Sequence, residues 1–162
     1  MVRTGRIWKF GDDINTDLIF PGEAFRLSET ERLRYVFRAN RPGWVDEIQP
    51  GDLIVGGRNF GTGSSRPGGL LLKHLMLGGL VAETLNGLFY RNCVNCGFPA
   101  LECGGVFEAF EEGDEAEMDL DKGTVVNLRT GRMLQGVRVP TSILELFAAG
   151  GIGPLLKSEG FF

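Results

Sequence analysis

The chain has 162 residues with a formal net charge of −4, 43% apolar residues and 23% charged residues, which is enough sequence for one domain with its own hydrophobic core. No apolar run approaches the roughly 20 residues of a membrane span, and the N-terminal residues lead into no apolar signal-peptide core. Basic residues are scattered through an acidic chain, which argues against a nucleic-acid-binding face. We therefore expect one cytoplasmic domain over residues 1–162 that binds neither membrane nor nucleic acid.

The cysteine and histidine content restricts the chemistry further. Cys93, Cys96 and Cys103 are an odd number of cysteines, which fits a reducing compartment better than a disulfide framework. Cys93 and Cys96 have the spacing of a redox or metal pair, but a four-ligand site needs two more ligands and Cys103 supplies only one. Packed, inert thiols are therefore favoured. Unless the single histidine, His74, takes part, the chain has no Ser-His-Asp triad and no histidine base; a lone histidine of this kind is expected at or near the surface.

The N-terminal third predicts one strand and one capped helix. Alternating polar and apolar residues predict a strand over residues 5–10. The short apolar stretch at residues 18–20 ends at a Pro-Gly turn. Ser28 and Glu31 have the spacing of a capping box, which predicts a helix that ends at the Pro-Gly pair of residues 42–43. The apolar face of this helix would consist of Leu33, Val36 and Phe37.

The middle of the chain predicts alternating strands and helices. A short helical or irregular segment containing Trp44 is followed by an apolar strand at residues 53–55, a helix over residues 67–77 and a second apolar strand at residues 80–82, which is a βαβ unit. A second helix is expected over residues 85–94, followed by another strand at residues 98–101. The candidate N-caps of that second helix are Thr84 and Asn86.

The C-terminal third changes to a β-rich pattern. Short apolar segments near residues 118–120, 125–128 and 137–139 are separated by glycine-containing turns, which predicts antiparallel strands. A last helix is expected over residues 141–149, capped by Thr141 or Ser142 and ended by Gly150. The acidic residues between 111 and 117 are assigned to solvent. The fold class predicted is α/β, with a mixed, partly parallel sheet flanked by helices and a β-rich C-terminal third.

The segment with the strongest chemical signal is residues 59–67, Asn-Phe-Gly-Thr-Gly-Ser-Ser-Arg-Pro, between a strand and a helix. Glycines allow a ligand to approach the backbone, and with Pro67 as first helical residue the cap would be Ser65 or Arg66. Loop amides beside a cation bind carboxylate or phosphate. The Gly-Lys-Ser ending of a Walker loop and the third glycine of a dinucleotide fingerprint are both absent. The alternative from these residues alone is a turn with capping serines and a surface arginine.

Taken as a whole, residues 59–66 resemble the signature of the swivelling domain of the aconitase superfamily, which in two-chain members is the small subunit. Three further segments resemble the same family and occur in the same order. Residues 12–17 have its Asp-x-x-x-Thr-Asp pattern, residues 50–52 its Pro-Gly-Asp, and residues 92–99 its Asn-x-x-Asn-x-Gly-x-Pro. The resemblance covers most of residues 5–105, with the spacing of compact archaeal-type isopropylmalate dehydratase small subunits.

The resemblance implies a swivelling β/β/α domain and a set of site residues. Ser64 would be the serine whose alkoxide removes the proton α to a carboxylate, and Asp17 would orient a group of a partner chain. Arg26 would contact substrate from a loop that resembles the family's specificity loop, where Phe25 and Leu27 add apolar surface. The substrate-binding residues implied are Thr62, Gly63, Ser65, Arg66 and Arg26. Where the family often has Glu-His after its Ser-Ser-Arg, this chain has Pro67 and Gly68, which leaves the substrate open.

The same resemblance implies a reaction and a partner. The reaction is dehydration and rehydration through a cis-alkene diacid, as in the isomerisation of 2- and 3-isopropylmalate in leucine biosynthesis. The Lewis acid would be a [4Fe-4S] cluster on an obligate large subunit, in a heterodimer or heterotetramer, with no metal bound by this chain. The alternatives within this class are homoaconitase and dehydratases of other substituted malates or methylcitrate. The alternative from another class is a non-catalytic anion-binding module.

Overall fold

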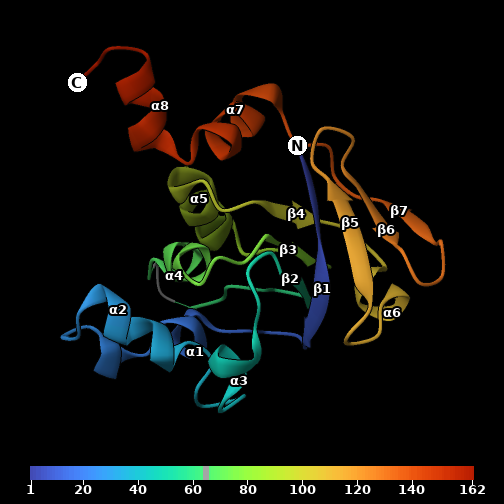
Figure 1. Cartoon of the computed structure of the whole chain (residues 1–162), viewed down its shortest axis with the longest axis horizontal. Helices are drawn as coiled ribbons and strands as arrows, with labels where there is room; N and C mark the ends of the chain where they lie inside the picture. Colours follow the sequence, from blue (N-terminus) through green and yellow to red (C-terminus); the bar gives the residue numbers. More distant parts are fainter. Residues whose placement is uncertain (64–65) are drawn as a thin grey trace.

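The computed structural model describes residues 1–63 and 66–162, and within them seven strands form one sheet in the order β4-β3-β2-β1-β5-β6-β7 (Figure 1). The strands are β1 (Val2–Phe10), β2 (Leu53–Gly56), β3 (Gly79–Ala82), β4 (Ala100–Glu102), β5 (Glu115–Asp119), β6 (Thr124–Asn127) and β7 (Met133–Gln135). Strands β1 to β4 pair in parallel, whereas β5, β6 and β7 add in antiparallel fashion beyond β1. The predicted mixed, partly parallel sheet with a β-rich C-terminal third is confirmed.

Strand β1 joins the two halves of the sheet. Its first part, Val2 to Arg6, pairs with β5, and its second part, Ile7 to Phe10, pairs with β2. Helix α4 (Gly68–His74) connects the parallel strands β2 and β3, which confirms the predicted βαβ unit. The sheet therefore brings the ends of β1 and β2, and the loops that follow them, to the same edge.

The other helices flank the sheet in Figure 1. They are α1 (Thr16–Ile19), α2 (Glu29–Arg32), α3 (Trp44–Glu47), α5 (Gly87–Cys96), α6 (Val106–Ala109), α7 (Thr141–Ala149) and α8 (Ile152–Ser158). Of the two candidate caps of α5, Asn86 is the N-cap, since its side chain accepts hydrogen bonds from the N–H groups of Leu88 and Phe89. The patterns did not predict α6 or α8. No helix in the described ranges has the length and apolar character to cross a membrane.

Three local predictions are wrong at helix ends and in one strand. The N-cap of α7 is Pro140, which has no side-chain acceptor, and the two predicted caps, Thr141 and Ser142, lie inside the first turn of the helix. The predicted end of this helix at Gly150 is confirmed. Helix α4 begins at Gly68 with Pro67 as N-cap, so Pro67 is not the first helical residue and Arg66 is not the cap. The other candidate cap, Ser65, lies outside the described residues. The last antiparallel strand is β7, N-terminal to the predicted residues 137–139.

The helix predicted after Ser28 is correct at its start and too long. Ser28 and Glu31 form the capping box, but α2 ends at Arg32 and continues only as the 3₁₀ turn Leu33–Tyr35. Phe37 has a φ of +56° and is fully buried, and its ring stacks on that of Phe10 with centroids 4.2 Å apart. Tertiary packing of Phe37 therefore overrides the local helical preference.

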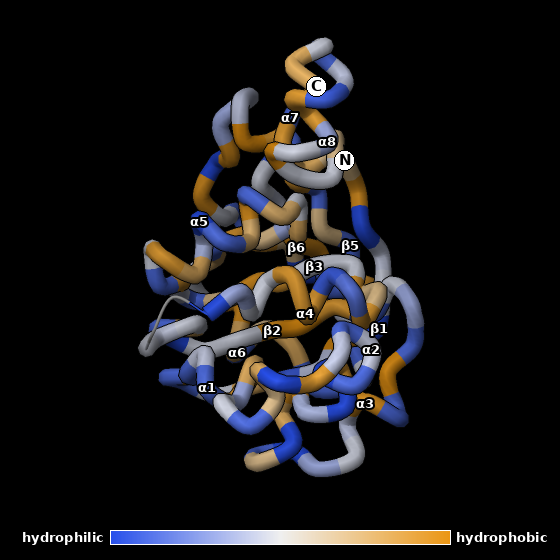
Figure 2. The backbone as a smooth tube through the Cα atoms, turned by 90° about the vertical axis from the view of Figure 1, so that its left-hand side faces the viewer, coloured by the Kyte–Doolittle hydropathy of each residue, from blue (hydrophilic) through white to orange (hydrophobic). Residues whose placement is uncertain are grey.

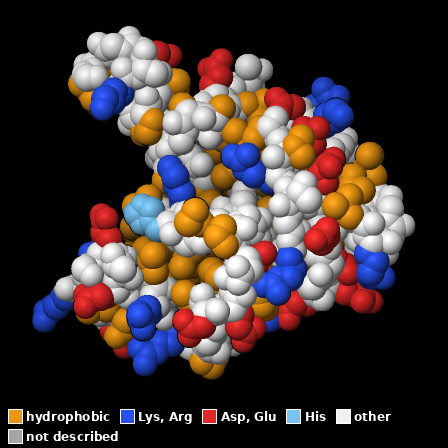
Figure 3. Space-filling view, in the orientation of Figure 1, with side chains coloured by type: hydrophobic (Ala, Val, Ile, Leu, Met, Phe, Trp, Pro, Cys, Tyr) orange, Lys and Arg blue, Asp and Glu red, His pale blue; other side chains and the backbone are white. Residues whose placement is uncertain are grey.

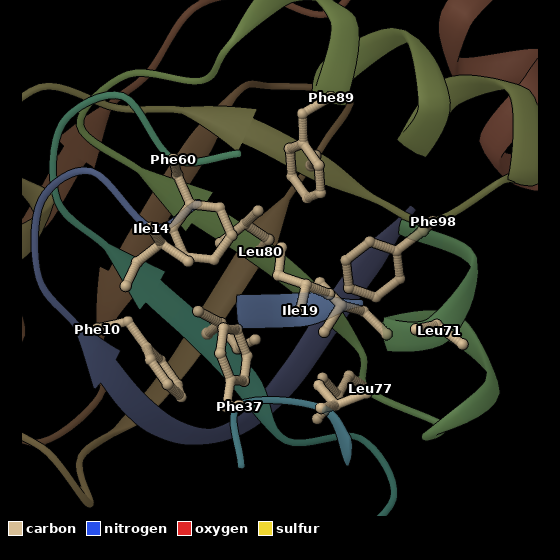
Figure 4. Close-up of a cluster of buried hydrophobic side chains, with 14 of the residues drawn as sticks. Phe10, Ile14, Ile19, Phe37, Phe60, Leu71, Leu77, Leu80, Phe89 and Phe98 are labelled. Carbon is tan, nitrogen blue, oxygen red and sulfur yellow. The ribbon is translucent and has the colours of Figure 1, made fainter. Parts of the chain in front are cut away.

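Two hydrophobic clusters lie on the two faces of the parallel strands. Along β1, Ile7 belongs to one cluster and Trp8 to the other, as expected from the period of two in a strand. All four residues of β2 are buried, which is typical of a parallel strand covered on both faces. Figure 2 shows this hydrophobic strand running through the middle of the molecule, and Figure 4 shows the cluster that underlies the loops after β1 and β2. Trp8 and Trp44 are both buried in it.

A buried carboxylate, Asp114, ties β6 to the loop before β5, so the prediction that the acidic residues between 111 and 117 face solvent is wrong at this position. It accepts hydrogen bonds from Asn127 Nδ2 at 2.8 Å, from the Glu111 N–H at 2.9 Å and from Arg129 Nε at 2.6 Å. The hydrogen bond from the Arg129 side chain is the main cause that lowers the pKa of Asp114 from 3.8 to about 2, against the opposing effect of burial. Because its pKa is lower in the folded chain, Asp114 stabilises the fold fully above about pH 4 and less as the pH falls toward 2.

We expect Asp114→Asn to lower the free energy of unfolding at neutral pH by roughly 1–3 kcal/mol, because it removes a hydrogen-bonded charge that is 6% exposed. The difference between the variant and the unaltered chain should shrink as the pH falls from about 4 to about 2. Urea unfolding curves recorded over this pH range measure this difference in the free energy of unfolding. Asp46→Asn, at an exposed position of α3, is the matched control; a difference that stays constant with pH contradicts the assigned pKa.

Candidate active site

The loop between β2 and α4 carries the predicted serine motif. Gly61 and Gly63 have φ values of +87° and +100°, a region that favours glycine. A Cβ on Gly61 would overlap the side chain of Phe89, and one on Gly63 would lie 2.8 Å from Oδ1 of Asn15. The two glycines are therefore needed for the loop to lie this close to α5 and to the loop after β1.

The loop after β2 is bonded to the loop after β1. The N–H of Gly61 donates to the carbonyl of Ile14 at 2.7 Å, and the N–H of Thr16 donates to the carbonyl of Thr62 at 2.8 Å. Next to these bonds, Asn15 caps α1, its side chain accepting from the N–H of Asp17 at 2.7 Å. Two motifs about 50 residues apart in sequence are thus one structural unit.

Within this unit Arg66 meets Asp17. Its NH1 lies 2.6 Å from Oδ1 of Asp17 and donates to the carbonyl of Phe20 at 2.8 Å. The guanidinium carbon lies 5.0 Å from the centroid of the Phe25 ring. Arg66 is mostly buried, with 23% of its side chain exposed, whereas 58% of Asp17 is exposed. Among the described residues, Nε and NH2 of Arg66 donate no hydrogen bond, and two donors on one edge of a guanidinium match the geometry of a carboxylate.

Helix α5 holds the backbone of Arg66 from the other side. Asn92 Nδ2 donates to the carbonyl of Arg66 at 3.3 Å, and the same carbonyl accepts from the N–H of Gly68 at 2.7 Å. The ring centroids of Phe60 and Phe89 lie 5.6 Å apart, and Figure 4 shows the two side chains next to each other in the cluster below the loop. The sequence did not single out Asn92 as a site residue, although it is the first residue of the Asn-x-x-Asn pattern.

The segment after α1 carries Arg26 on its surface. Arg32 shapes this segment, since its Nε and NH2 donate to the carbonyls of Ala24 at 3.3 Å and Phe25 at 2.9 Å. The Phe25 ring lies 4.6 Å from that of Phe20 and is 47% exposed. Arg26 is exposed, and its side chain makes no hydrogen bond or ion pair with any residue in the described ranges. The structure therefore places the segment that carries Arg26 next to Arg66, because Phe25 of this segment packs against the Arg66 guanidinium.

A cleft of about 400 Å³ opens beside Asp17. Leu18, Pro21 and Glu23 line it from the side of α1, and Tyr35 and Arg38 line it from the segment after α2. The guanidinium of Arg38 lies over the Tyr35 ring, 4.8 Å from its centroid. The sequence patterns did not indicate Tyr35 or Arg38, which lie in and just after the 3₁₀ turn that follows α2.

The two serines of the motif, Ser64 and Ser65, lie outside the described residues. Their roles as base and as carboxylate ligand therefore stay predictions. The residues on either side are described: Thr62 pairs with the loop after β1, Gly63 is exposed, and Arg66 pairs with Asp17. Four of the predicted site residues, Asp17, Thr62, Gly63 and Arg66, thus lie together, and the two serines lie between Gly63 and Arg66 in the chain.

The cysteines and the histidine lie away from this arrangement of groups. Cys93 and Cys103 are buried and Cys96 is partly buried, all as free thiols. Burial raises the pKa of Cys93 and of Cys96, and raises that of Cys103 to about 11. Unreactive, neutral thiols follow from these surroundings. His74, the last residue of α4, is exposed. Residues 1–63 and 66–162 contain no group of three His, Cys, Asp or Glu side chains placed to hold a metal ion.

Comparisons with known proteins cover nearly the whole chain. The chain is 41% identical over 157 residues to the isopropylmalate/citramalate isomerase small subunit of Methanocaldococcus jannaschii, covering 96% of this chain and 94% of that one. It is 39% identical over 165 residues to 3-isopropylmalate dehydratase small subunit 1 of Thermotoga maritima, covering 100% and 98% of the two chains. The 3-isopropylmalate dehydratase small subunit of Aquifex aeolicus is 37% identical, with coverage of 96% and 94%. No family model matches the chain.

A solved structure has the same fold. The crystal structure of 3-isopropylmalate dehydratase from Methanocaldococcus jannaschii superposes with a TM-score of 0.91 and 31% sequence identity, covering 99% of this chain and 96% of that one. The mixed seven-stranded sheet and its flanking helices therefore form a fold already known in a solved relative.

Proposed function

This chain belongs to the family of 3-isopropylmalate dehydratase small subunits, and from that membership we propose how its residues take part in the reaction. It is the small subunit of a hydro-lyase that acts together with a large subunit. The resemblance found in the serine motif, the Asp-x-x-x-Thr-Asp motif and the Asn-x-x-Asn motif is thereby confirmed at the level of the family. The roles of the individual residues, the cofactor and the assembly are proposals.

We propose that Arg66 holds a carboxylate of the substrate. The observation that carries this role is the state of its guanidinium: NH1 is fixed by Asp17 and Phe20, while Nε and NH2 have no partner in the described part of the chain. Two parallel N–H groups on one edge match the two oxygens of a carboxylate. Fixing the other edge in advance lowers the entropic cost of binding.

We assign Asp17 first to positioning Arg66. Its Oδ1 pairs with Arg66, and its other oxygen, on a side chain that is 58% exposed, accepts no hydrogen bond from the described residues. We propose that this second oxygen orients a group of the partner chain, as the sequence resemblance implies. Arg26, exposed and uncommitted, is proposed as a second contact to substrate, next to the apolar surface of Phe25.

We propose Ser64 as the base that removes the proton α to a carboxylate, with Ser65, Thr62 and Gly63 binding substrate beside Arg66. Removal of that proton and departure of the hydroxyl on the neighbouring carbon form a cis-alkene diacid, and addition of water in the opposite sense gives the isomer. A serine hydroxyl is a weak base at neutral pH. The cation of Arg66, two residues away in the chain, supports its ionised form by electrostatic stabilisation.

A [4Fe-4S] cluster, which would supply the Lewis acid for departure of the hydroxyl, is assigned to the large subunit. The described residues of this chain do not fit such a cluster: they offer no group of three potential ligands, and two of the three cysteines are buried with raised pKa values. The proposed assembly is a heterodimer or heterotetramer in the cytoplasm, with the substrate enclosed between the chains.

The surface around α4 and α5 supports a partner on this side. Leu70 and Met76, at the start of α4 and just after it, and Leu88 on α5 are large apolar side chains that are 36%, 64% and 50% exposed. Figure 3 shows a recess on this side, between the projecting C-terminal end and the part formed by α1 and α2. Exposed apolar side chains gathered around a recess are typical of a protein interface.

The experiment that tests the proposed function is anaerobic affinity purification of this chain from its source cells. The co-purified proteins are identified by mass spectrometry and the complex is assayed for dehydration. We expect a larger iron-sulfur protein to co-purify and the complex to act on isopropylmalate. Isolation of the chain alone, without iron and without activity on any candidate acid, would contradict the proposal and favour an anion-binding module.

Citramalate is the second candidate substrate. One relative, at 41% identity, is named for both isopropylmalate and citramalate, and both molecules are malates with an alkyl group. The same purified complex should be assayed with isopropylmalate, citramalate, homocitrate and citrate. The ratio of kcat/KM values between the acids decides which alkyl group the Phe25 segment accepts.

A further inference from the structure

A second cavity, of about 340 Å³, lies at the open edge of β4. Residues 100–102 of β4, the first turns of α5 and the segment of residues 137–140 enclose it, and α5 and β4 lie side by side in Figure 1. The N–H of Val137 donates to the carbonyl of Glu102 at 2.8 Å, so the last residue of β4 is paired with the segment of residues 137–140. The cavity shares no lining residue with the cleft beside Asp17.

The walls of this cavity are mainly apolar. Leu85, Leu101, Val139 and Pro140 contribute to them, and the exposed polar surface inside is much the smaller part. The volume falls in the range of small-molecule sites, which are largely apolar with a few polar groups that fix orientation. A ligand for this cavity therefore has an apolar body.

Three polar side chains of the cavity have bonding capacity to spare. Glu102 Oε1 accepts from the N–H of Leu85 at 2.7 Å, and its second oxygen accepts no hydrogen bond from residues 1–63 or 66–162. The half-buried Tyr90 hydroxyl and the exposed Arg138 guanidinium form no hydrogen bond or ion pair with those residues either. Burial, and to a smaller extent Cys93 and Glu102, raise the pKa of Tyr90, so its hydroxyl stays a neutral donor.

We propose that this cavity binds an α-amino acid with an apolar side chain. The apolar walls take the side chain, the free carboxylate oxygen of Glu102 accepts from the ammonium group, and Arg138 pairs with the carboxylate at the rim. A ligand that carries both an ammonium and a carboxylate group satisfies Glu102 and Arg138 together, whereas an amine leaves Arg138 unpaired and an acid faces the like charge of Glu102. The proposal does not depend on the role of Ser64 or Arg66.

The cavity is also connected to the serine loop. Leu85, one of its wall residues, forms a parallel β-bridge with Phe60, and the N–H of Asn86 donates to the carbonyl of Phe60 at 2.9 Å. Phe60 belongs to the loop that leads to Arg66. Binding of a ligand in the cavity can therefore also be detected by NMR, as changes in the chemical shifts of the amide groups of this loop.

The test uses the full chain and isothermal titration calorimetry with L-phenylalanine and L-leucine. Two analogues of L-phenylalanine are titrated beside it: 2-phenylethylamine, which lacks the carboxylate, and 3-phenylpropionate, which lacks the ammonium group. We expect saturable 1:1 binding of the amino acids and at least roughly 10-fold weaker binding of both analogues, the usual loss with one charged hydrogen-bonded contact.

Variants assign the binding to this cavity. Glu102→Gln keeps an oxygen for the Leu85 N–H, and Arg138→Gln keeps a polar side chain while it removes the guanidinium and its charge; each should weaken binding about 10-fold. Their matched controls are Glu108→Gln and Arg132→Gln, at exposed positions that do not line the cavity, and these should leave the dissociation constant unchanged. A dissociation constant above about 1 mM for both amino acids, equal binding of 3-phenylpropionate, or indifference to both cavity variants would each overturn the proposal.

Discussion

Replacing Ser64 with alanine is expected to lower kcat roughly 10²- to 10⁴-fold, the usual effect of losing a general base. The change removes one oxygen from a loop in which Arg66, two residues later, is held by Asp17 and Asn92. Assembly with the large subunit should therefore remain intact. The measurement is kcat of the reconstituted two-chain enzyme, together with the stoichiometry of the complex by size-exclusion chromatography.

Two further variants separate the chemical role of Ser64 from a structural one. Ser142→Ala, at an exposed position of α7, is the matched control and should leave kcat unchanged. Ser65→Ala should raise KM more than it lowers kcat, since Ser65 is assigned to binding. Near-normal turnover of the Ser64 variant in a fully assembled enzyme would rule out its role as base.

The sheet was predictable because its signals are local. Residues 53–55 and 80–82 are short apolar runs around a helix, and glycine-containing turns separate the later strands, so the βαβ unit and the antiparallel addition follow from pattern alone. The length of the helix after Ser28 was not predictable in this way. Phe37 leaves the helical pattern because its ring fills a gap between Phe10 and Trp44, and no local signal reports that gap.

The ion pair between Asp17 and Arg66 could be predicted from the sequence only in part. Both motifs directly follow strands that pair in parallel, and the carboxyl ends of such strands share an edge. Neighbouring strands could therefore have placed the two loops together. The partner of each side chain depends on the exit direction of α1 and on Gly63, whose close approach to Asn15 brings the loops into contact. The cavity at β4 had no signal, since residues 137–139 of its lining were predicted as a strand.

Changing Arg66 to lysine is expected to lower kcat/KM roughly 10- to 100-fold, with most of the effect in KM. Lysine keeps the positive charge but has no planar edge with two parallel donors, so it loses a charged hydrogen bond of about 1.5–3 kcal/mol to the substrate carboxylate. It also loses the fixed geometry that NH1 obtains from Asp17 and the carbonyl of Phe20. Steady-state kinetics of the two-chain enzyme measure both parameters.

The companion variant Asp17→Asn shows how Arg66 is positioned. Its amide oxygen still accepts from NH1, but the charge is gone, so we expect a smaller loss in kcat/KM than for Arg66→Lys. If Asp17 acts only through Arg66, the double variant should lose little more than Arg66→Lys alone, because residues that act as one unit are not additive. If the losses in kcat/KM of the two single variants add up in the double variant, Asp17 has a separate role, in orienting a group of the partner chain. Arg34→Lys, at an exposed position of the 3₁₀ turn after α2, is the control for an arginine-to-lysine change.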